Sequence, residues 1–171
     1  MPVRYAVERH RWDEAAQIEP KPESPPQVAA IAVWARALGR TRGKHPVDVS
    51  SDIAELTGYE QQLQDAGSDY WAAQTRILRE EIAAWSEQAN GNPQKAEIEL
   101  RAAADEEDSI EKLPVTPGPI VPAREQLGEL LLIQHRPSDG VTAFKASLRN
   151  APNRKNALDR LAHPFIPVGN K

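Results

Sequence analysis

The 171-residue sequence contains no cysteine, which excludes disulfides, thiolate catalysis and cysteine-ligated zinc sites. Aromatic residues make up only 5% of the chain, and there is a single methionine against 25 alanines, so the composition favours closely packed helices over sheets. No stretch approaches the roughly 18 apolar residues of a membrane span. The N-terminal sequence MPVRYAVERHRW carries charges where a signal peptide needs an apolar segment. We therefore expect no membrane span and, by default, a cytoplasmic location.

Positive charge is scarce in most of the chain. The net charge is -4, and general binding to nucleic acid requires clustered positive charge that tracks the phosphate backbone. The seven lysines and arginines after residue 133 face only two aspartates there, so a basic end follows an acidic body. This end either orients a partner or is an ordinary solvated surface. We expect no nucleic-acid partner.

Fifteen prolines and nine glycines divide the chain into segments with helical spacing of apolar residues. Two proline-rich stretches, 19–26 and 113–122, are predicted to be extended connectors. The second connector either carries a function or only stiffens a join. The predicted helices are 27–42, 46–66, 70–90, 93–111, 121–135, 137–152 and 156–162.

Small residues recur at a fixed spacing where neighbouring helices would cross. Gly128 lies twelve residues before Gly140, and Phe144, Ser147 and Pro152 follow at further fixed intervals. Two helices of a hairpin approach closely only where the facing residues are small, which would explain a glycine that costs up to about 1 kcal/mol relative to alanine. The twelve-residue interval is found again in two other pairs: Ala84 with Ala96, and Ala37 with Val49.

This pattern resembles the tetratricopeptide repeat, a helical hairpin of about 34 residues with small residues at the crossing and a proline at the end. The match is best at residues 121–154. The resemblance implies an all-α fold in which helical hairpins form a right-handed superhelical array, as a single domain over residues 1–171. Its copies would be a partial unit at 1–19, units at 27–67, 69–111 and 121–154, and a closing helix at 155–162.

The resemblance also implies a binding surface. In this family the first helices of successive pairs line a concave groove that receives a peptide or protein segment. By register, the groove residues would be Trp34, Leu38 and Arg42 with Ile31; Glu81, Trp85 and Gln88 with Leu78; and Glu125, Glu129 and Leu132 with Gln126. Such a surface is apolar with acidic edges, so the expected partner segment has apolar anchors and some lysine or arginine. Trp34 and Trp85 are alternatively explained as fillers between helix pairs.

The sequence contains no motif that indicates a catalytic or metal-binding site. The four histidines fall at predicted turns and helix ends, and no two have a metal-type spacing. The DEED sequence at Asp105 to Asp108 is either a carboxylate cluster or, as we favour, a solvated acidic helix end, because consecutive helical residues point in different directions. The sequence predicts no catalytic residue, no metal site and no cofactor.

The sequence therefore predicts a non-catalytic protein-interaction scaffold and not an enzyme. Two alternatives remain open: an accessory or regulatory domain of a larger enzyme or assembly, and a self-association module that stacks through the ends of the array. If the chain is a segment of a longer protein, an upstream signal could direct it to export.

Overall fold

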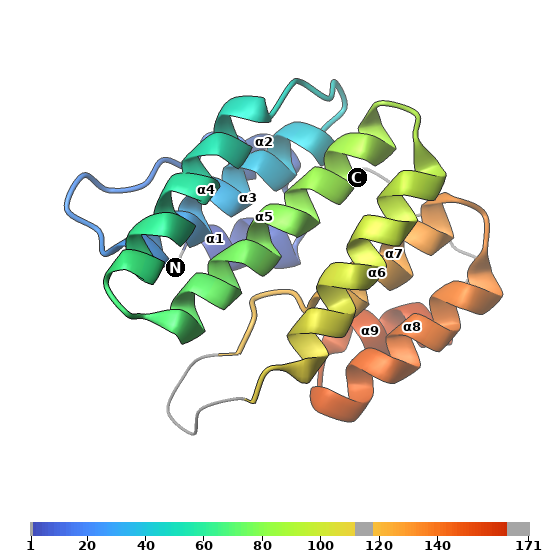
Figure 1. The fold of residues 1–171 in the computed structure, drawn as a ribbon. Helices are drawn as coiled ribbons and strands as arrows, with labels where there is room; N and C mark the ends of the chain where they lie inside the picture. The colour runs from blue at the N-terminus through green and yellow to red at the C-terminus, as the bar shows by residue number, and fades with distance from the viewer. Residues whose placement is uncertain (1, 112–117, 164–171) are drawn as a thin grey trace. The chain divides into compact units, whose positions relative to one another are not determined.

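A computed structural model describes residues 2–111 and 118–163, which form nine α-helices and no strand (Figure 1). The predicted all-α class is confirmed. Contacts group the chain into two compact units, Met1–Glu99 and Leu100–Lys171, each described by itself below. The boundary falls inside α6 (Pro93–Ser109). The single domain over residues 1–171 stays a prediction, and most of the 113–122 connector lies outside the described residues.

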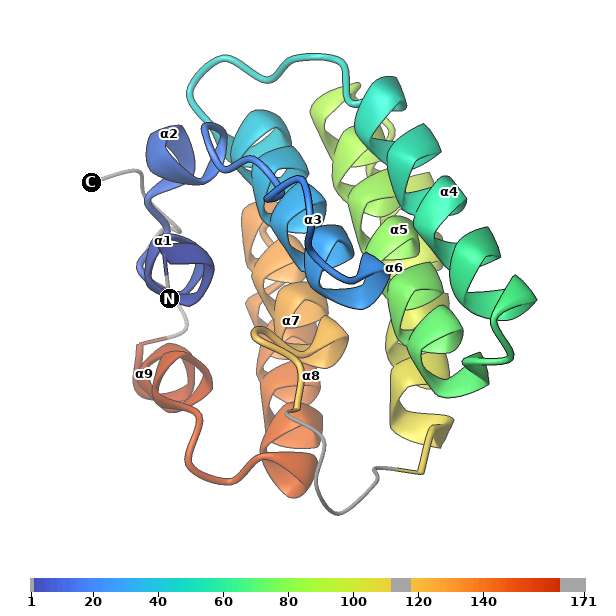
Figure 2. The same cartoon turned by 90° about the vertical axis from the view of Figure 1, so that its left-hand side faces the viewer.

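The first unit is built around three long helices that pack against one another. They are α3 (Pro26–Arg42), α4 (Ser50–Asp65) and α5 (Asp69–Ala89). Two short helices, α1 (Pro2–Glu8) and α2 (Trp12–Ala15), pack against α3 (Figure 2). The large apolar side chains of this unit that are fully buried include Trp34, Leu38, Leu56, Ile77 and Ile82.

The second unit contains the end of α6 and three further helices. These are α7 (Ala123–Ile133), α8 (Pro137–Asn150) and α9 (Lys155–Ala162). A pair is formed by α7 and α8, and α9 packs on α8. Phe144, which the sequence places four residues after Gly140, is fully buried, so it belongs to the core of this pair.

One type of turn ends four of the helices. A residue with left-handed backbone follows each of these helices. It is His10 after α1 (φ 53°), Gly67 after α4 (φ 68°), Gly91 after α5 (φ 80°) and His135 after α7 (φ 60°). At each turn the left-handed N–H donates to the carbonyl three residues back. The next N–H donates to the carbonyl five residues back, as in Arg136 to Leu131 at 2.9 Å. Histidines therefore fill the place that glycine takes in the other two turns.

A small buried residue lies five positions after each left-handed residue. The four are Ala15, Ala72, Ala96 and Gly140, all buried. Two of them, Ala96 and Gly140, belong to the predicted pairs of small residues. The same turn thus precedes four different helices, and the fourth residue of each is small and buried.

Gly128 and Gly140 meet where α7 crosses α8, as the sequence predicts. A Cβ added to Gly140 would lie 3.1 Å from the Gly128 carbonyl oxygen, and one added to Gly128 would lie 2.7 Å from the Phe144 ring. These two glycines therefore allow the close approach of the helices. Ala84 and Ala96 are both fully buried.

Gly39 makes an even closer approach, which the sequence spacing misses. A Cβ on Gly39 would lie 2.5 Å from the Trp12 carbonyl oxygen and 2.8 Å from the backbone carbon of Ala15. Because these atoms belong to the backbone of α2, no side-chain rotation relieves the clash. Gly39 therefore allows the backbone of α2 to pack directly against α3.

One predicted helix start is wrong. Pro46 does not open the helix at 46–66; α4 begins at Ser50, and Val49 is its N-cap residue rather than a position inside it. The preceding loop is held on α3 by the Val47 N–H, which donates to the Arg40 carbonyl at 3.2 Å. Asp48 accepts hydrogen bonds from the backbone and hydroxyl of Ser50, which favours a start there. The other predicted helices match within two residues at each end.

We predict that Gly39→Ala lowers the free energy of unfolding by about 1–3 kcal/mol, the usual cost of overpacking. The matched control is Gly58→Ala inside α4, where an added Cβ meets nothing within 4 Å. This control should raise stability by about 0.5–1 kcal/mol, because alanine is the better helix former. Urea unfolding followed by circular dichroism measures both changes, and equal effects of the two variants would contradict the close contact.

Candidate functional site

The predicted groove residues of the first unit contact one another. The Trp34 indole N–H donates to Glu81 Oε2 at 2.6 Å, which ties α3 to α5. Trp34 and Glu81 are each only 1% exposed. A carboxylate at this depth requires a hydrogen-bond donor, and Trp34 supplies one. Two of the predicted groove residues, Trp34 and Glu81, therefore join α3 to α5 inside the unit.

A stack of rings and a guanidinium fills the next turn of the same face. The Arg42 guanidinium lies 4.0 Å from the centre of the Trp85 ring and 4.3 Å from that of Trp12. His10 stacks on Trp12, with 5.1 Å between ring centres. Guanidinium groups between aromatic faces are stabilised by cation–π attraction. Residues from α1–α2 therefore complete this part of the predicted groove.

Burial decides which groove residues of the first unit a partner could reach. Trp34, Leu38, Glu81 and Trp85 are at most 2% exposed. Arg42 and Gln88, like Ile31 and Leu78, are half-buried. This matches the alternative in which Trp34 and Trp85 fill spaces between helices. A segment that touched the four buried side chains would have to displace the atoms that cover them, so their binding role stays a prediction.

In the second unit, Glu125 belongs to an internal ion pair. It is fully buried, and Arg154, which precedes α9, donates to its two carboxylate oxygens at 2.9 and 3.2 Å. Arg154 also donates to the Ile120 carbonyl at 2.7 Å. Glu129 is 1% exposed and Leu132 is half-buried. Sequence reasoning missed Arg154, because no local spacing links residues 29 positions apart.

The acidic DEED sequence is neither a carboxylate cluster for a cation nor wholly solvated. Glu107 accepts a hydrogen bond from the Ala123 N–H at 2.9 Å and so satisfies a donor at the start of α7. Asp105 and Asp108 both pair with Arg124 at 2.6 Å. These carboxylates therefore join the end of α6 to the beginning of α7.

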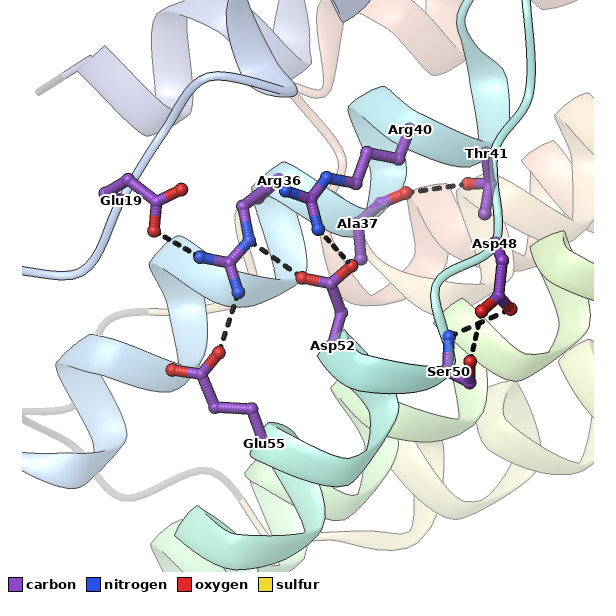
Figure 3. Close-up of polar contacts among 9 residues, drawn as sticks. All are labelled: Glu19, Arg36, Ala37, Arg40, Thr41, Asp48, Ser50, Asp52 and Glu55. Atoms are coloured by element: carbon purple, nitrogen blue, oxygen red, sulfur yellow. Dashed lines mark hydrogen bonds and ion pairs between the residues drawn. The ribbon is translucent and has the colours of Figure 1, made fainter.

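A polar network of the first unit joins α3 to α4 (Figure 3). The Arg36 guanidinium donates to Asp52 and Glu55, each at 2.7 Å, and to Glu19 on the connector before α3. Arg40 donates to the second oxygen of Asp52 at 2.8 Å. Burial lowers the pKa of Arg36, but the hydrogen bonds to Asp52 and Glu55 outweigh it, so its pKa lies above the ordinary value. Arg36 therefore stays charged.

Sequence reasoning missed this network, although the spacing holds a signal. The two arginines are four residues apart, and the two acidic residues of α4 are three apart, so each pair shares one helix face. Arg36 lies among buried alanines. A charged residue there needs partners, and the next helix offers them.

A pocket of about 420 Å³ lies beside the network, between the end of α2 and the loop that follows α3. Arg40 and Glu19 belong to both the network and the pocket. The remaining charged side chains that line it are Asp13 and Lys44, and His45 lines it as well. Its size falls within the roughly 300–1,000 Å³ typical of ligand sites. None of the predicted groove residues lines it.

Comparison of the chain with protein-family models, with curated proteins and with solved structures gives no match. The described helices include none with both the length and the apolar character needed to cross a membrane. Among the described residues, no three histidine or acidic side chains are grouped so as to hold a metal ion. The tetratricopeptide resemblance therefore depends on the residues of this chain alone.

We expect Asp52→Asn to lower the free energy of unfolding by roughly 3–5 kcal/mol, because it leaves two guanidinium groups without their shared buried counter-ion. The comparison variant is Glu19→Gln, whose side chain is 66% exposed in the native chain. Its loss should stay below about 1 kcal/mol, as for other exposed ion pairs. Denaturant unfolding of both variants tests the difference. Similar losses would show that Asp52 is not the centre of the network.

A pH effect is expected at Tyr59, which donates a hydrogen bond to Glu55 at 3.1 Å. Burial raises the pKa of the Tyr59 phenol, and the hydrogen bond to Glu55 raises it further. The folded state thus favours the neutral phenol. Its contribution to stability is complete below the ordinary pKa of about 10 and is lost as the pH rises through the raised value.

Carbon-13 NMR of the Tyr59 ring measures this pKa directly. Glu55→Gln should move it down towards the ordinary value, since the carboxylate acceptor is lost. Glu23→Gln, an exposed change on the connector, is the control and should leave the titration unchanged. A Tyr59 titration that Glu55→Gln does not move would show that Glu55 does not set this pKa.

Proposed function

We propose that this chain is a non-catalytic helical-repeat module that binds a peptide or protein segment. The observation that carries the proposal is the repeated turn: four helix ends share one left-handed turn, and each is followed five residues later by a small buried residue. Repetition of one local unit is typical of arrays that bury one side of each helix pair against the next and use the other side for recognition.

Helix neighbours within the first unit support the same architecture. The helix α3 contacts both α4, its partner in the hairpin, and α5, which begins the next pair, while α4 also contacts α5. In a repeat array each hairpin meets the following hairpin in this way. The finer description, a right-handed superhelical array of tetratricopeptide type, belongs to this proposal.

The reachable part of the proposed surface lies at the ends of the first helices. Arg42 at the end of α3 and Gln88 near the end of α5 are half-buried, whereas their neighbours Trp34 and Glu81 are covered. A bound segment would therefore contact the surface at these ends, with the carboxylates of the unit attracting lysine or arginine. The scaffold supplies position, not chemistry.

The test is selection from a displayed library of random peptides against the native full chain. We expect enriched sequences that combine apolar anchors with lysine or arginine. Their affinity, measured by fluorescence anisotropy, should fall by a few fold with Gln88→Ala, since one interfacial hydrogen-bonding side chain is worth about 0.5–1.5 kcal/mol. The matched control is Gln94→Ala, an exposed glutamine on α6.

Failure to select any peptide that binds the native chain would contradict the interaction role. Selected peptides that are indifferent to Gln88→Ala would keep the role and move the binding surface away from these helix ends. Thermal unfolding of both variants shows whether either change has altered the fold.

A further inference from the structure

The pocket between α2 and the loop after α3 has walls that are held in place. Gly39 lies in the pocket lining and brings the backbones of the two helices together, because even a methyl group there would clash with α2. The Val47 N–H bonds to the Arg40 carbonyl and fixes the loop wall. A site with fixed walls loses little freedom when a ligand binds.

Two charged side chains of opposite sign are presented at set positions in this pocket. Glu19 is held by Arg36, and Arg40 is held by the fully buried Asp52 (Figure 3). One oxygen of Glu19 and further N–H groups of Arg40 are not used in these bonds. The ion-pair network of Arg36 and Asp52 thus holds one carboxylate and one guanidinium that face the pocket.

Two further charged side chains, Asp13 and Lys44, line the pocket. In the described part of the chain, Asp13 and Lys44 make no side-chain hydrogen bond or ion pair. Asp13 points towards the loop wall, since its Oδ1 lies 3.9 Å from where a Cβ on Gly43 would be. The pocket is therefore lined by two acidic groups, Asp13 and the fixed Glu19, and by two basic groups, Lys44 and the fixed Arg40. His45 follows Lys44 in its lining.

We propose that this pocket binds a peptide segment in which a basic and an acidic side chain are neighbours. The basic group pairs with Glu19 and Asp13, and the acidic group pairs with Arg40 and Lys44. Val47, which is 55% exposed at the pocket, contacts the aliphatic stem of the basic residue. The inference depends on the proposed function for the peptide nature of the ligand.

An extended ligand fits this pocket better than an enclosed small molecule. Most of its lining side chains, including Asp13, Lys44 and His45, are exposed, so the pocket opens to solvent. A chain segment can lie across such an opening and place two side chains in it. Opposite charges on the ligand then meet both signs at once, whereas a ligand of one sign leaves one pair of groups unmatched and faces repulsion.

The experiment titrates the nitrogen-15-labelled full chain with four capped dipeptides: Lys–Glu, Lys–Ala, Ala–Glu and Ala–Ala. Binding is read from the amide signals of Ala16, Gly39 and Gly43, which line the pocket. Lys–Glu should bind up to about fivefold more tightly than either singly charged dipeptide, the upper end of the advantage expected from one added exposed charge pair. Equal affinities of the three charged dipeptides would overturn the proposal.

Two variants assign the charges. Asp13→Asn should remove part of the advantage of lysine in the ligand but keep that of glutamate, and Lys44→Gln should do the reverse. The matched controls are Glu23→Gln and Lys21→Gln, which make the same charge changes at exposed connector positions outside the pocket. All four changes are on exposed side chains, so the fold is retained. Loss that is the same in variants and controls would also overturn the proposal.

Free glycine, a small zwitterion, tests whether the ligand of the pocket is a peptide or a free amino acid. If glycine binds as tightly as Lys–Glu, the pocket recognises free amino acids and the peptide assignment is overturned. If library peptides bind the chain but ignore Asp13→Asn and Lys44→Gln, the proposed function stands and this pocket is not its site.

Discussion

The close approach of helix backbones is the constraint on which the rest of this structure depends. With aromatic residues at 5% of the chain and alanine as the commonest apolar residue, large side chains are too few to fill wide spaces between helices. Dense packing is then reached only if the helices touch almost backbone to backbone. Gly39 against α2, and Gly140 against Gly128, are the points where this contact is tightest.

Buried hydrogen bonds and ion pairs between helices add to the apolar packing of the core. Four buried carboxylates receive a donor from another element: Glu81 from Trp34, Asp52 from Arg36, Glu107 from Ala123 and Glu125 from Arg154. Such pairs contribute little net stability compared with apolar packing, but they are costly to leave unpaired. They therefore favour one arrangement of the helices over alternatives. The face that family resemblance assigns to a partner is in large part occupied by these internal ties.

Much of the fold was readable from local sequence. Proline at the start of α6 and α8 and glycine at two turns act within one hairpin, and so does the spacing of Gly128 and Gly140; these local predictions held. Pro46 failed because proline is also compatible with a loop, and the Asp48–Ser50 contact set the true start of α4. The Arg36 network, the pocket and the Arg154 pair join distant segments. Spacing within one helix carries no information about which distant segment supplies the partner.

The docking of α2 against Gly39 has a consequence for the order in which the chain folds. Helices α1 and α2 have seven and four residues, well below the roughly 12–15 that an isolated helix needs to persist in water. Their hydrogen bonds gain protection only when α3 is already in place to receive them. We therefore expect the N-terminal region to dock after α3 has formed and to exchange its amide protons with solvent sooner than the α3–α4–α5 core does.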